Sequence, residues 1–413
     1  MGSQGQHYDG LALSFILTLN DSKRFPTLAR QISNLAADVA SGRHEKRVEL
    51  LAQARALVQA IETPQESMLQ YLWADASRPT ASGIKIGLFH HLARDGGTPK
   101  KATHLASSIG IDQDVLTRLL RHLAAVGHIT QTDIDEYKPT RFALSLTIPE
   151  VYGAYIQGLL IIPGLQQMPN YIASLVNNPS PDRPTTMFEK GHSTKLSFFE
   201  YVYSKPETIE KFAGHMASSR HGQATWMDPS FYPVQELLVK GADTDPDAVF
   251  LVDVGGNTGG DIVKFNEMHP GVPGRLVLQD LPSVVEGVKA LPSKVEAMGH
   301  DFFQEQPVKG ARAYSIHRVL HDWPDNKCRD ILARLKDAMR PGYSKLLIKE
   351  HVIRSTGASW RVTSLDLTLW AMLGAKERSE ENWQELLESV GLRIVKVWTP
   401  VDGLESLIEC EVA

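Results

Sequence analysis

Apolar residues in the first part of the chain recur at the three- and four-residue spacing of amphipathic helices. Between residues 22 and 69 this spacing predicts two helices, which form an N-terminal arm whose apolar stripe packs on a partner subunit or domain. From residue 83 the pattern predicts short helices that end at Gly110 and Gly127, and then two strands at residues 128–130 and 141–144. Short helices followed by a two-stranded wing indicate a winged-helix module.

Residues 150–240 predict further helices that are rich in aromatic and methionine side chains. Such a stripe is typical of a helical core. Around Met187 and Phe198 it is equally compatible with the wall of a flat hydrophobic pocket.

After residue 247 the pattern changes to strands that alternate with helices. The expected strands are residues 249–254, 275–279, 311–317, 344–348 and 393–398, and the expected helices are residues 259–269, 283–291, 326–339 and 380–390. Repeated strand–helix units predict an α/β domain in which helices cover both faces of a parallel sheet.

The charge of the chain argues against nucleic acid as a partner. Forty-three Lys and Arg stand against 48 Asp and Glu among 413 residues, a net charge of −5, so the basic excess of nucleic-acid-binding proteins is missing. The presumed recognition helix of the winged-helix module carries Asp112 and Asp114 against Arg118 and Arg121, and therefore has no net charge. We expect a dimerisation module there.

Cysteine usage and hydropathy indicate a cytoplasmic protein. Cys328 and Cys410 are the two cysteines of the chain, and neither has a neighbouring cysteine, which excludes a disulfide scaffold and a cysteine zinc site. The apolar stretch at residues 11–19 has no Lys or Arg before it and no cleavage site after it, so we expect neither a secretory signal nor a membrane association.

A glycine-rich turn follows the first strand of the α/β part, at residues 253–260. The dinucleotide pattern GxGxxG is not satisfied, because Asn257 and Thr258 occupy positions that it reserves for glycine, and this weakens an NAD reading. The next strand ends in Asp280, 27 residues after Asp253, where an acid binds ribose hydroxyls in folds of this type. The turn and the acid together predict a nucleoside ligand.

Two later segments add candidate chemistry at the same edge of the sheet. Asp301 and Phe302 place an acid and an aromatic ring where an adenine could be bound, although a loop with core phenylalanines is the simpler alternative. Residues 317–325 (HRVLHDWPD) bring two histidines to a strand end, and histidine titrates near neutrality, which suits the removal of a proton from a hydroxyl.

These motifs resemble a known family. VDVGGNTGG, LQDLP, GHDFF, HRVLHDWPD and DLTLWAMLGAKERSEENWQELLESVGL are similar, in order and spacing, to the plant-type and fungal small-molecule O-methyltransferases that use S-adenosylmethionine. The resemblance covers residues 80–410 and implies a Rossmann-like methyltransferase domain, α/β in class, preceded by a mainly α-helical winged-helix dimerisation domain. It also implies S-adenosylmethionine as cofactor, S-adenosylhomocysteine as product, a homodimer and no metal.

The same resemblance assigns roles to individual residues. It implies that His321 is the general base, that Glu350 hydrogen-bonds this base, and that Glu377 flanks it; the alternative for Glu377 is a solvated carboxylate paired with Lys376 or Arg378. The implied cofactor contacts are Gly255, Gly256, Asp280, Asp301, Phe302, and His317 or Arg318. The candidate substrate-pocket residues, for which a core role has equal weight, are Met187, Phe198, Trp370, Met372 and Leu373. Asn257 replaces a third glycine, which is tolerable if the position needs no unusual backbone angles.

The sequence thus predicts an N-terminal helical arm (residues 1–62), a winged-helix-like dimerisation domain (63–150), a helical linker and pocket region (151–240) and a catalytic domain (241–413). We expect methylation of a hydroxyl on an aromatic or heteroaromatic secondary metabolite, such as a fungal polyketide or indole alkaloid. The alternatives are methyl transfer to nitrogen or to an N-hydroxyl on the same scaffold, a winged-helix regulator that only senses the cofactor, and an NAD oxidoreductase.

Overall fold

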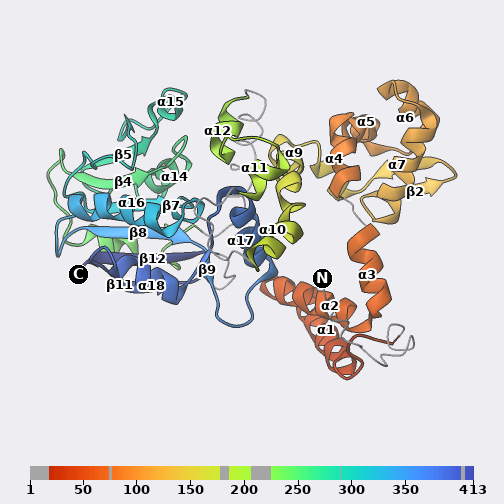
Figure 1. The fold of residues 1–413 in the computed structure, drawn as a ribbon, viewed down its shortest axis with the longest axis horizontal. Coiled ribbons are helices and arrows are strands. Elements are labelled where there is room, and N and C mark those ends of the chain that lie inside the picture. Colours follow the sequence, from red (N-terminus) through yellow and green to blue (C-terminus); the bar gives the residue numbers. More distant parts are fainter. Residues whose placement is uncertain (1–17, 74–76, 177–185, 206–224, 289, 401–404) are drawn as a thin grey trace. The chain divides into compact units, whose positions relative to one another are not determined.

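The computed structural model describes residues 18–73, 77–176, 186–205, 225–288, 290–400 and 405–413 (Figure 1). The chain divides between Ile156 and Gln157 into two units, each with its own apolar core. The four predicted segments are therefore distributed over two units. Residues 177–185 and 206–224, which belong to the segment expected to be rich in aromatic and methionine side chains, lie outside the described residues.

The N-terminal arm consists of three α-helices where two were expected: α1 Phe25–Ala40, α2 Arg47–Ile61 and α3 Pro64–Trp73, with a short 3-10 turn, η2 His44–Lys46, before α2. The expected second helix is interrupted before Pro64, because the residue that precedes a proline is driven out of the helical conformation. Thr63 and Glu66 then start α3 by exchanging hydrogen bonds, with 2.9 Å from the Thr63 nitrogen to Oε2 of Glu66 and 3.2 Å from the Glu66 nitrogen to Oγ1 of Thr63.

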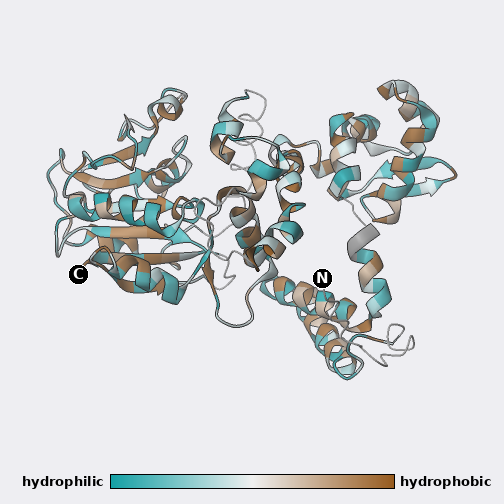
Figure 2. Ribbon diagram, in the orientation of Figure 1, coloured by the Kyte–Doolittle hydropathy of each residue, from teal (hydrophilic) through white to brown (hydrophobic). Residues whose placement is uncertain are grey.

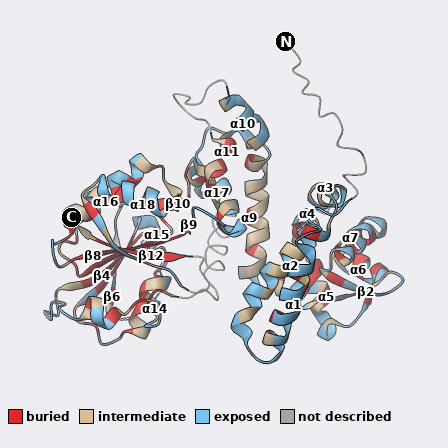
Figure 3. Cartoon of the chain, turned by 90° about the horizontal axis from the view of Figure 1, so that it is seen from below, coloured by how far each residue is buried: buried red, intermediate tan, exposed pale blue. Residues whose placement is uncertain are grey.

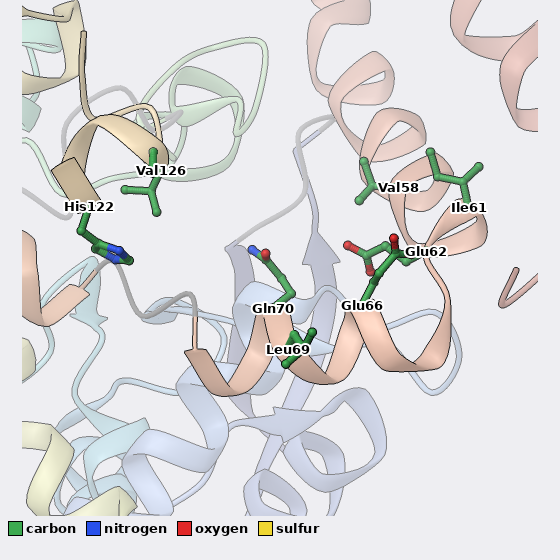
Figure 4. Close-up of a pocket in the computed structure, with 9 residues that line it drawn as sticks. Val58, Ile61, Glu62, Glu66, Leu69, Gln70, His122 and Val126 are labelled. Atoms are coloured by element: carbon green, nitrogen blue, oxygen red, sulfur yellow. The ribbon is translucent and has the colours of Figure 1, made fainter. Parts of the chain in front are cut away.

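A shallow hollow of about 720 Å³ is lined by the C-terminal half of α2, by α3 and by the end of α7 (Figure 4). Its walls carry the apolar side chains Val58, Ile61, Leu69 and Val126 beside Glu62 and Glu66. None of the site residues predicted from the sequence lies there.

The rest of the first unit has the element order of a winged-helix module. Its helices are α4 Ser77–Lys85, α5 Leu88–Ala93, η3 Arg94–Gly97, α6 Ala102–Ile109, α7 Gln113–Ala125 and α8 Arg141–Ser145, and its strands are β1 Lys100–Lys101, β2 Ile129–Asp133 and β3 Glu136–Pro139. The strands form an antiparallel sheet in the order β1-β3-β2. Asp112 caps α7 by accepting a hydrogen bond from the backbone nitrogen of Val115 at 3.0 Å.

The second wing strand is not where the sequence predicted it. Residues 141–144 belong to α8, whose first turn is capped by Oγ1 of Thr140 at 3.1 Å from the Ala143 nitrogen. The wing strand is β3, which turns back from β2 through Asp135 in a left-handed conformation (φ 49°). A threonine cap therefore outweighed the β-like composition of residues 141–144.

The second unit combines helices with a seven-stranded sheet. Helix α9 Pro149–Leu165 runs through the boundary between the units, and the helices that follow are α10 Met168–Leu175, α11 Met187–Gly191, α12 Phe198–Tyr203 and the π-helical turn η4 Gln235–Val239. The strands are β4 Val249–Val254, β5 Arg275–Asp280, β6 Val295–Gly299, β7 Ala313–His317, β8 Lys345–Glu350, β11 Leu392–Trp398 and β12 Ser406–Val412. Among the described residues their order is β11-β12-β8-β7-β4-β5-β6.

The connecting elements are α14 Gly260–Met268, α15 Pro282–Val285, η5 Leu320–Asp322, α16 Asp325–Ala338, α17 Trp360–Leu373 and α18 Glu380–Glu388. A separate pair of two-residue parallel strands is formed by β9 Val352–Ile353 and β10 Arg378–Ser379. The sequence missed β6 and β12 and overestimated the helix at residues 283–291, which is limited to α15. Strand β12 runs antiparallel to both of its neighbours, so the sheet is mixed where a parallel sheet was expected.

Helices cover both faces of this sheet, as predicted. One face packs against α16 and α18 through Ile331, Leu335 and Leu386. The other packs against α14 and residues 226–238, including Phe265 and Trp226. The five inner strands of the order are accordingly apolar (Figure 2) and mostly buried, whereas the edge strands β6 and β11 and the outward helix faces keep exposed residues (Figure 3). The α/β fold class predicted from the sequence is confirmed, and none of the described helices has the length and apolar character of a membrane span.

Candidate active site

The glycine-rich turn between β4 and α14 requires its glycines. A Cβ atom at Gly256 would lie 2.4 Å from Oδ2 of Asp253 and 2.5 Å from Cδ1 of Leu278, which no real side chain tolerates. Gly255 has a left-handed conformation, with φ of 69°. Asn257 has one too, with φ of 54°, so the condition under which the sequence made this replacement tolerable is not met. Asparagine is among the residues that adopt this conformation most readily, which explains its presence.

Asp280 is tied to the same turn. At the end of β5 its Oδ2 accepts a hydrogen bond from the backbone nitrogen of Asn257 at 2.8 Å, and its Oδ1 accepts one from Leu281 at 2.7 Å. Burial raises the pKa of Asp280, and these two backbone hydrogen bonds oppose the rise. The sequence linked the glycine turn to Asp280 only through the expected order of the strands. In the structure the two are in direct contact.

Phe302 lies over the glycine turn. Its Cε1 is 3.7 Å from the position of a Cβ atom on Gly255, and Cγ2 of Val319 is 3.0 Å from the same position. Asp301 holds the turn that carries Phe302, because its Oδ1 accepts a hydrogen bond from the Phe303 nitrogen at 3.0 Å. The absence of a side chain at Gly255 therefore lets Val319 and Phe302 approach the glycine backbone closely.

His317 and Arg318 both face a buried carboxylate of the chain itself. Nδ1 of His317 lies 2.5 Å from Oδ2 of Asp261, in the first turn of α14, and Nε2 lies 3.2 Å from Oε2 of Glu405. Glu405 also forms ion pairs with Arg318 and Lys349. Burial raises the pKa of Glu405, but these cations outweigh it and hold that pKa well below its usual range. Because both ring nitrogens of His317 are engaged, the geometry argues against this residue as a direct cofactor ligand.

His321 is the centre of a buried cluster of carboxylates. Its Nδ1 lies 2.9 Å from Oε1 of Glu377 and 3.6 Å from Oε2 of Glu350, and its Nε2 lies 3.5 Å from Oδ1 of Asp322. Burial alone lowers the pKa of His321, but Glu350, Asp322 and Glu377 outweigh it and raise that pKa to about 10. Burial in turn raises the pKa of Asp322 to about 6.

The two glutamates exchange the roles predicted for them. Oε1 of Glu350 accepts hydrogen bonds from the backbone nitrogens of Val319, Leu320 and His321 at 3.1, 2.9 and 3.3 Å, so Glu350 holds the loop that carries the base. Glu377 makes the hydrogen bond to the imidazole that was expected of Glu350.

Glu377 is not a solvated carboxylate either. It is buried, and Lys376 and Arg378 pair instead with Asp325, each at 2.8 Å. The alternative that paired Glu377 with these two cations was therefore wrong. Burial raises the pKa of Glu377, but hydrogen bonds from His321 and His351 outweigh it and lower that pKa to about 2.

His351 is a buried member of the cluster that sequence reasoning missed. Its Nδ1 lies 3.1 Å from the same Oε1 of Glu377 that contacts His321. Ligand atoms of His321, His351 and Glu377 lie within 4.8 Å of one another, a spacing that a metal ion would also allow. The hydrogen bonds from the two histidines to Oε1 of Glu377 account for that spacing.

The candidate substrate-pocket residues are packed in two apolar clusters. Phe198, Met372 and Leu373 pack with Phe188. Met187 and Trp370 pack with Tyr171, whose ring meets that of Trp370 at a centroid distance of 5.7 Å. Met187, Phe198 and Met372 are buried, which is the core role that the sequence left open, whereas Trp370 and Leu373 keep partly exposed surfaces.

Comparison with known proteins identifies the family. Residues 171–393 match the model of the O-methyltransferase domain. Methyltransferase cfoC of Aspergillus candidus is 37% identical over 88% of this chain and 90% of its own. Among solved structures, LepI in complex with S-adenosylmethionine has a TM-score of 0.83 at 28% identity, covering 94% of this chain and 99% of that one. OxaC in complex with S-adenosylhomocysteine and oxaline has a TM-score of 0.80 at 26% identity, with the same coverage. The chain belongs to the S-adenosylmethionine-dependent O-methyltransferase family, as the sequence motifs indicated.

Proposed function

We propose that the protein methylates a hydroxyl group of an aromatic or heteroaromatic secondary metabolite, with His321 as the general base. The observation that carries this proposal is the hydrogen bond between His321 and the ionised Glu377. A carboxylate only accepts hydrogen bonds, so Nδ1 of His321 must carry the proton and Nε2 of the neutral ring has the free lone pair. That nitrogen is the acceptor for the hydroxyl proton.

The cofactor is held by the residues around the glycine turn. Gly255 and Gly256 would let the backbone approach the methionine part, Asp280 would accept hydrogen bonds from the ribose hydroxyls, and Asp301 and Phe302 would contact the adenine. When bound, S-adenosylmethionine supplies a methyl group on a positively charged sulfur, and its transfer leaves S-adenosylhomocysteine. Arg318 stays a candidate cofactor contact, although Glu405 already pairs with it.

The strength of the base matches the acceptor. A phenol has a pKa of about 10, and the carboxylates raise the pKa of His321 to the same region, so the proton passes between groups of equal affinity. The acceptor oxygen gains the methyl group, loses its proton to Nε2 of His321, and leaves a neutral ether and an imidazolium. Glu350, Glu377 and Asp322 stabilise that imidazolium.

The chemical class of the methyl acceptor follows from the strength of His321 as a base. A base of this strength favours an acidic hydroxyl over an amine nitrogen, and the partly exposed Trp370 and Leu373 offer apolar surface to a flat ring. Mass spectrometry of reactions with methyl-labelled S-adenosylmethionine and a panel of hydroxylated polyketides, flavonoids and indole alkaloids tests the proposal. Label on a ring nitrogen, or on no member of the panel while the cofactor is bound, would contradict it.

Activity is expected to rise with pH. The base must be neutral at the start of the reaction, and the carboxylates raise its pKa from about 6.5 to about 10, so at lower pH the imidazolium predominates and turnover is lost. We expect kcat/KM to increase up to about tenfold per pH unit through the neutral range, with a midpoint above that of free imidazole. Initial rates between about pH 6 and 11 at constant ionic strength measure this. A flat profile, or a midpoint at or below that of free imidazole, would contradict it.

We further propose that the protein is a homodimer in which a second copy covers the arm. Helix α2 exposes Val48, Leu51, Val58 and Ile61, and α3 exposes Met68 and Leu69, which together form an apolar face. Leu51 and Val58 lie two helical turns apart on one side of α2. The double variant Leu51→Asp/Val58→Asp is expected to halve the mass measured by light scattering.

A matched control for the dimer is Gln31→Asp/Asn34→Asp, which adds the same two charges at exposed polar positions of α1. It should keep the wild-type mass. A monomeric wild-type protein, or a double variant of unchanged mass, would show that this face is not the dimer contact.

A further inference from the structure

His351 and Glu377 face each other because of the small sheet next to the active site. Strands β9 and β10 pair in register, with Arg378 opposite Val352, and His351 and Glu377 are the residues directly before that pair. The backbone nitrogen of Glu377 is in addition bound to Oδ1 of Asp366 on α17, at 2.8 Å. The backbone on both sides of the His351–Glu377 contact is therefore fixed.

One oxygen of Glu377 receives two hydrogen bonds. Oε1 lies 2.9 Å from Nδ1 of His321 and 3.1 Å from Nδ1 of His351, while Oε2 forms no hydrogen bond with any residue that the structure describes. Since an ionised carboxylate only accepts, both histidines donate from Nδ1. His351 thus fixes which oxygen of Glu377 meets the base, and it competes with the base for that oxygen.

We propose that His351 is a positioning residue for the general base: it orients the Glu377 carboxylate towards His321 and, by sharing the oxygen, weakens the hold of Glu377 on the protonated ring. The inference rests on the proposed role of His321. Without the second donor, Glu377 would stabilise the imidazolium more strongly, and the base would release its proton only at higher pH.

The other charged groups around His321 do not depend on His351. Glu350 approaches from β8 and Asp322 from η5, and the cations Arg318 and His317 act on these two carboxylates, Arg318 on Asp322 and His317 on Glu350. Among the described carboxylates that face His321, only Glu377 is bound to a second imidazole. The hydrogen bond that links the His351 side chain to this group of carboxylates is therefore the one to Glu377.

Two substitutions separate the hydrogen-bond donor from the ring. His351→Phe keeps a ring of similar shape without a donor, and His351→Asn keeps an N–H group near the position of Nδ1 without the ring. We expect His351→Phe to move the midpoint of the kcat/KM profile upward by about one pH unit, which lowers activity about tenfold at pH 7 and restores it to within about twofold only near pH 11. We expect His351→Asn to keep the wild-type midpoint, and neither variant to change the KM for S-adenosylmethionine.

The pH profiles of these variants distinguish a positioning role of His351 from a purely structural one. A structural role alone would give a uniform loss across pH, larger for Asn than for Phe, and this result or an unshifted midpoint in His351→Phe would overturn the inference. If His351→Phe does not fold, His351→Leu, which also lacks a donor, takes its place. Full activity in His321→Ala would overturn the proposed function itself, whereas an inactive His321→Ala together with an unshifted His351→Phe would overturn only the role of His351.

Discussion

Replacing His321 by alanine is expected to lower kcat by about 10²- to 10⁴-fold, the usual contribution of a positioned general base. The imidazole is buried among three carboxylates, and its hydrogen bond to Glu377 fixes the proton on Nδ1. The hydrogen bond and ion pairs described for the ring are with Glu377, Glu350 and Asp322 and not with residues of the glycine turn or Asp280, so the affinity for S-adenosylmethionine should stay within about twofold. Single-turnover transfer of labelled methyl groups and calorimetric titration of the cofactor measure the two quantities separately.

A matched control for this variant is His269→Ala. His269 is also buried, and its Nε2 contacts the carbonyl oxygen of Met227 at 2.9 Å, on the face of the sheet covered by α14. That variant should lose stability and keep the wild-type kcat. If His321→Ala turned over like the wild type, the proton would have to leave the acceptor by another route, and His321 would not be the base.

The parts of the site that could be predicted from the sequence are those that strand order determines. The carboxyl ends of parallel strands meet at one edge, so the turn after β4, Asp280 after β5 and His321 after β7 had to come together. The need for glycine in this turn has a local cause, because a Cβ atom at Gly256 would collide with Asp253, three residues earlier.

The roles of the two glutamates could not be predicted in the same way. Which of them reaches the imidazole depends on side-chain direction at the end of β8, where Glu350 turns to the backbone nitrogens of residues 319–321. Glu377 reaches His321 because two-residue strands, β9 and β10, pair beside it. Strands of that length leave no periodic pattern in a sequence. For the same reason, the sequence did not indicate that His351 lies beside Glu377.

The spacing of residues in the sequence also did not indicate the partner of His317. The sequence showed a histidine and an arginine at the end of a strand, which suggested a cation for the cofactor. Their partner, Glu405, lies 88 residues further along the chain, at the start of an antiparallel strand that the pattern did not reveal. A contact between residues so distant in sequence depends on the full order of the sheet.

Replacing Asp280 by alanine is expected to weaken S-adenosylmethionine binding by about 10- to 150-fold, because a hydrogen bond to a charged group contributes roughly 1.5 to 3 kcal/mol. The carboxylate is proposed to bind the ribose, and it also accepts a hydrogen bond from the Asn257 nitrogen at 2.8 Å, so its loss loosens the glycine turn as well. Asp280→Asn should lie between the wild type and Asp280→Ala, since the amide keeps an acceptor oxygen without the charge. Calorimetric dissociation constants for S-adenosylmethionine and S-adenosylhomocysteine give the measurement.

The control is Asp247→Ala, which removes one exposed negative charge just before β4, at the opposite edge of the sheet, and should leave the affinity within about twofold. An unchanged affinity in Asp280→Ala would place the ribose elsewhere. At saturating cofactor Asp280→Ala should recover most of the wild-type kcat, because the carboxylates around His321 are untouched, whereas His321→Ala should gain nothing from added cofactor. Loss of affinity in one variant and loss of turnover in the other would assign cofactor binding to the β4–β5 end of the site and proton transfer to the β7–β8 end.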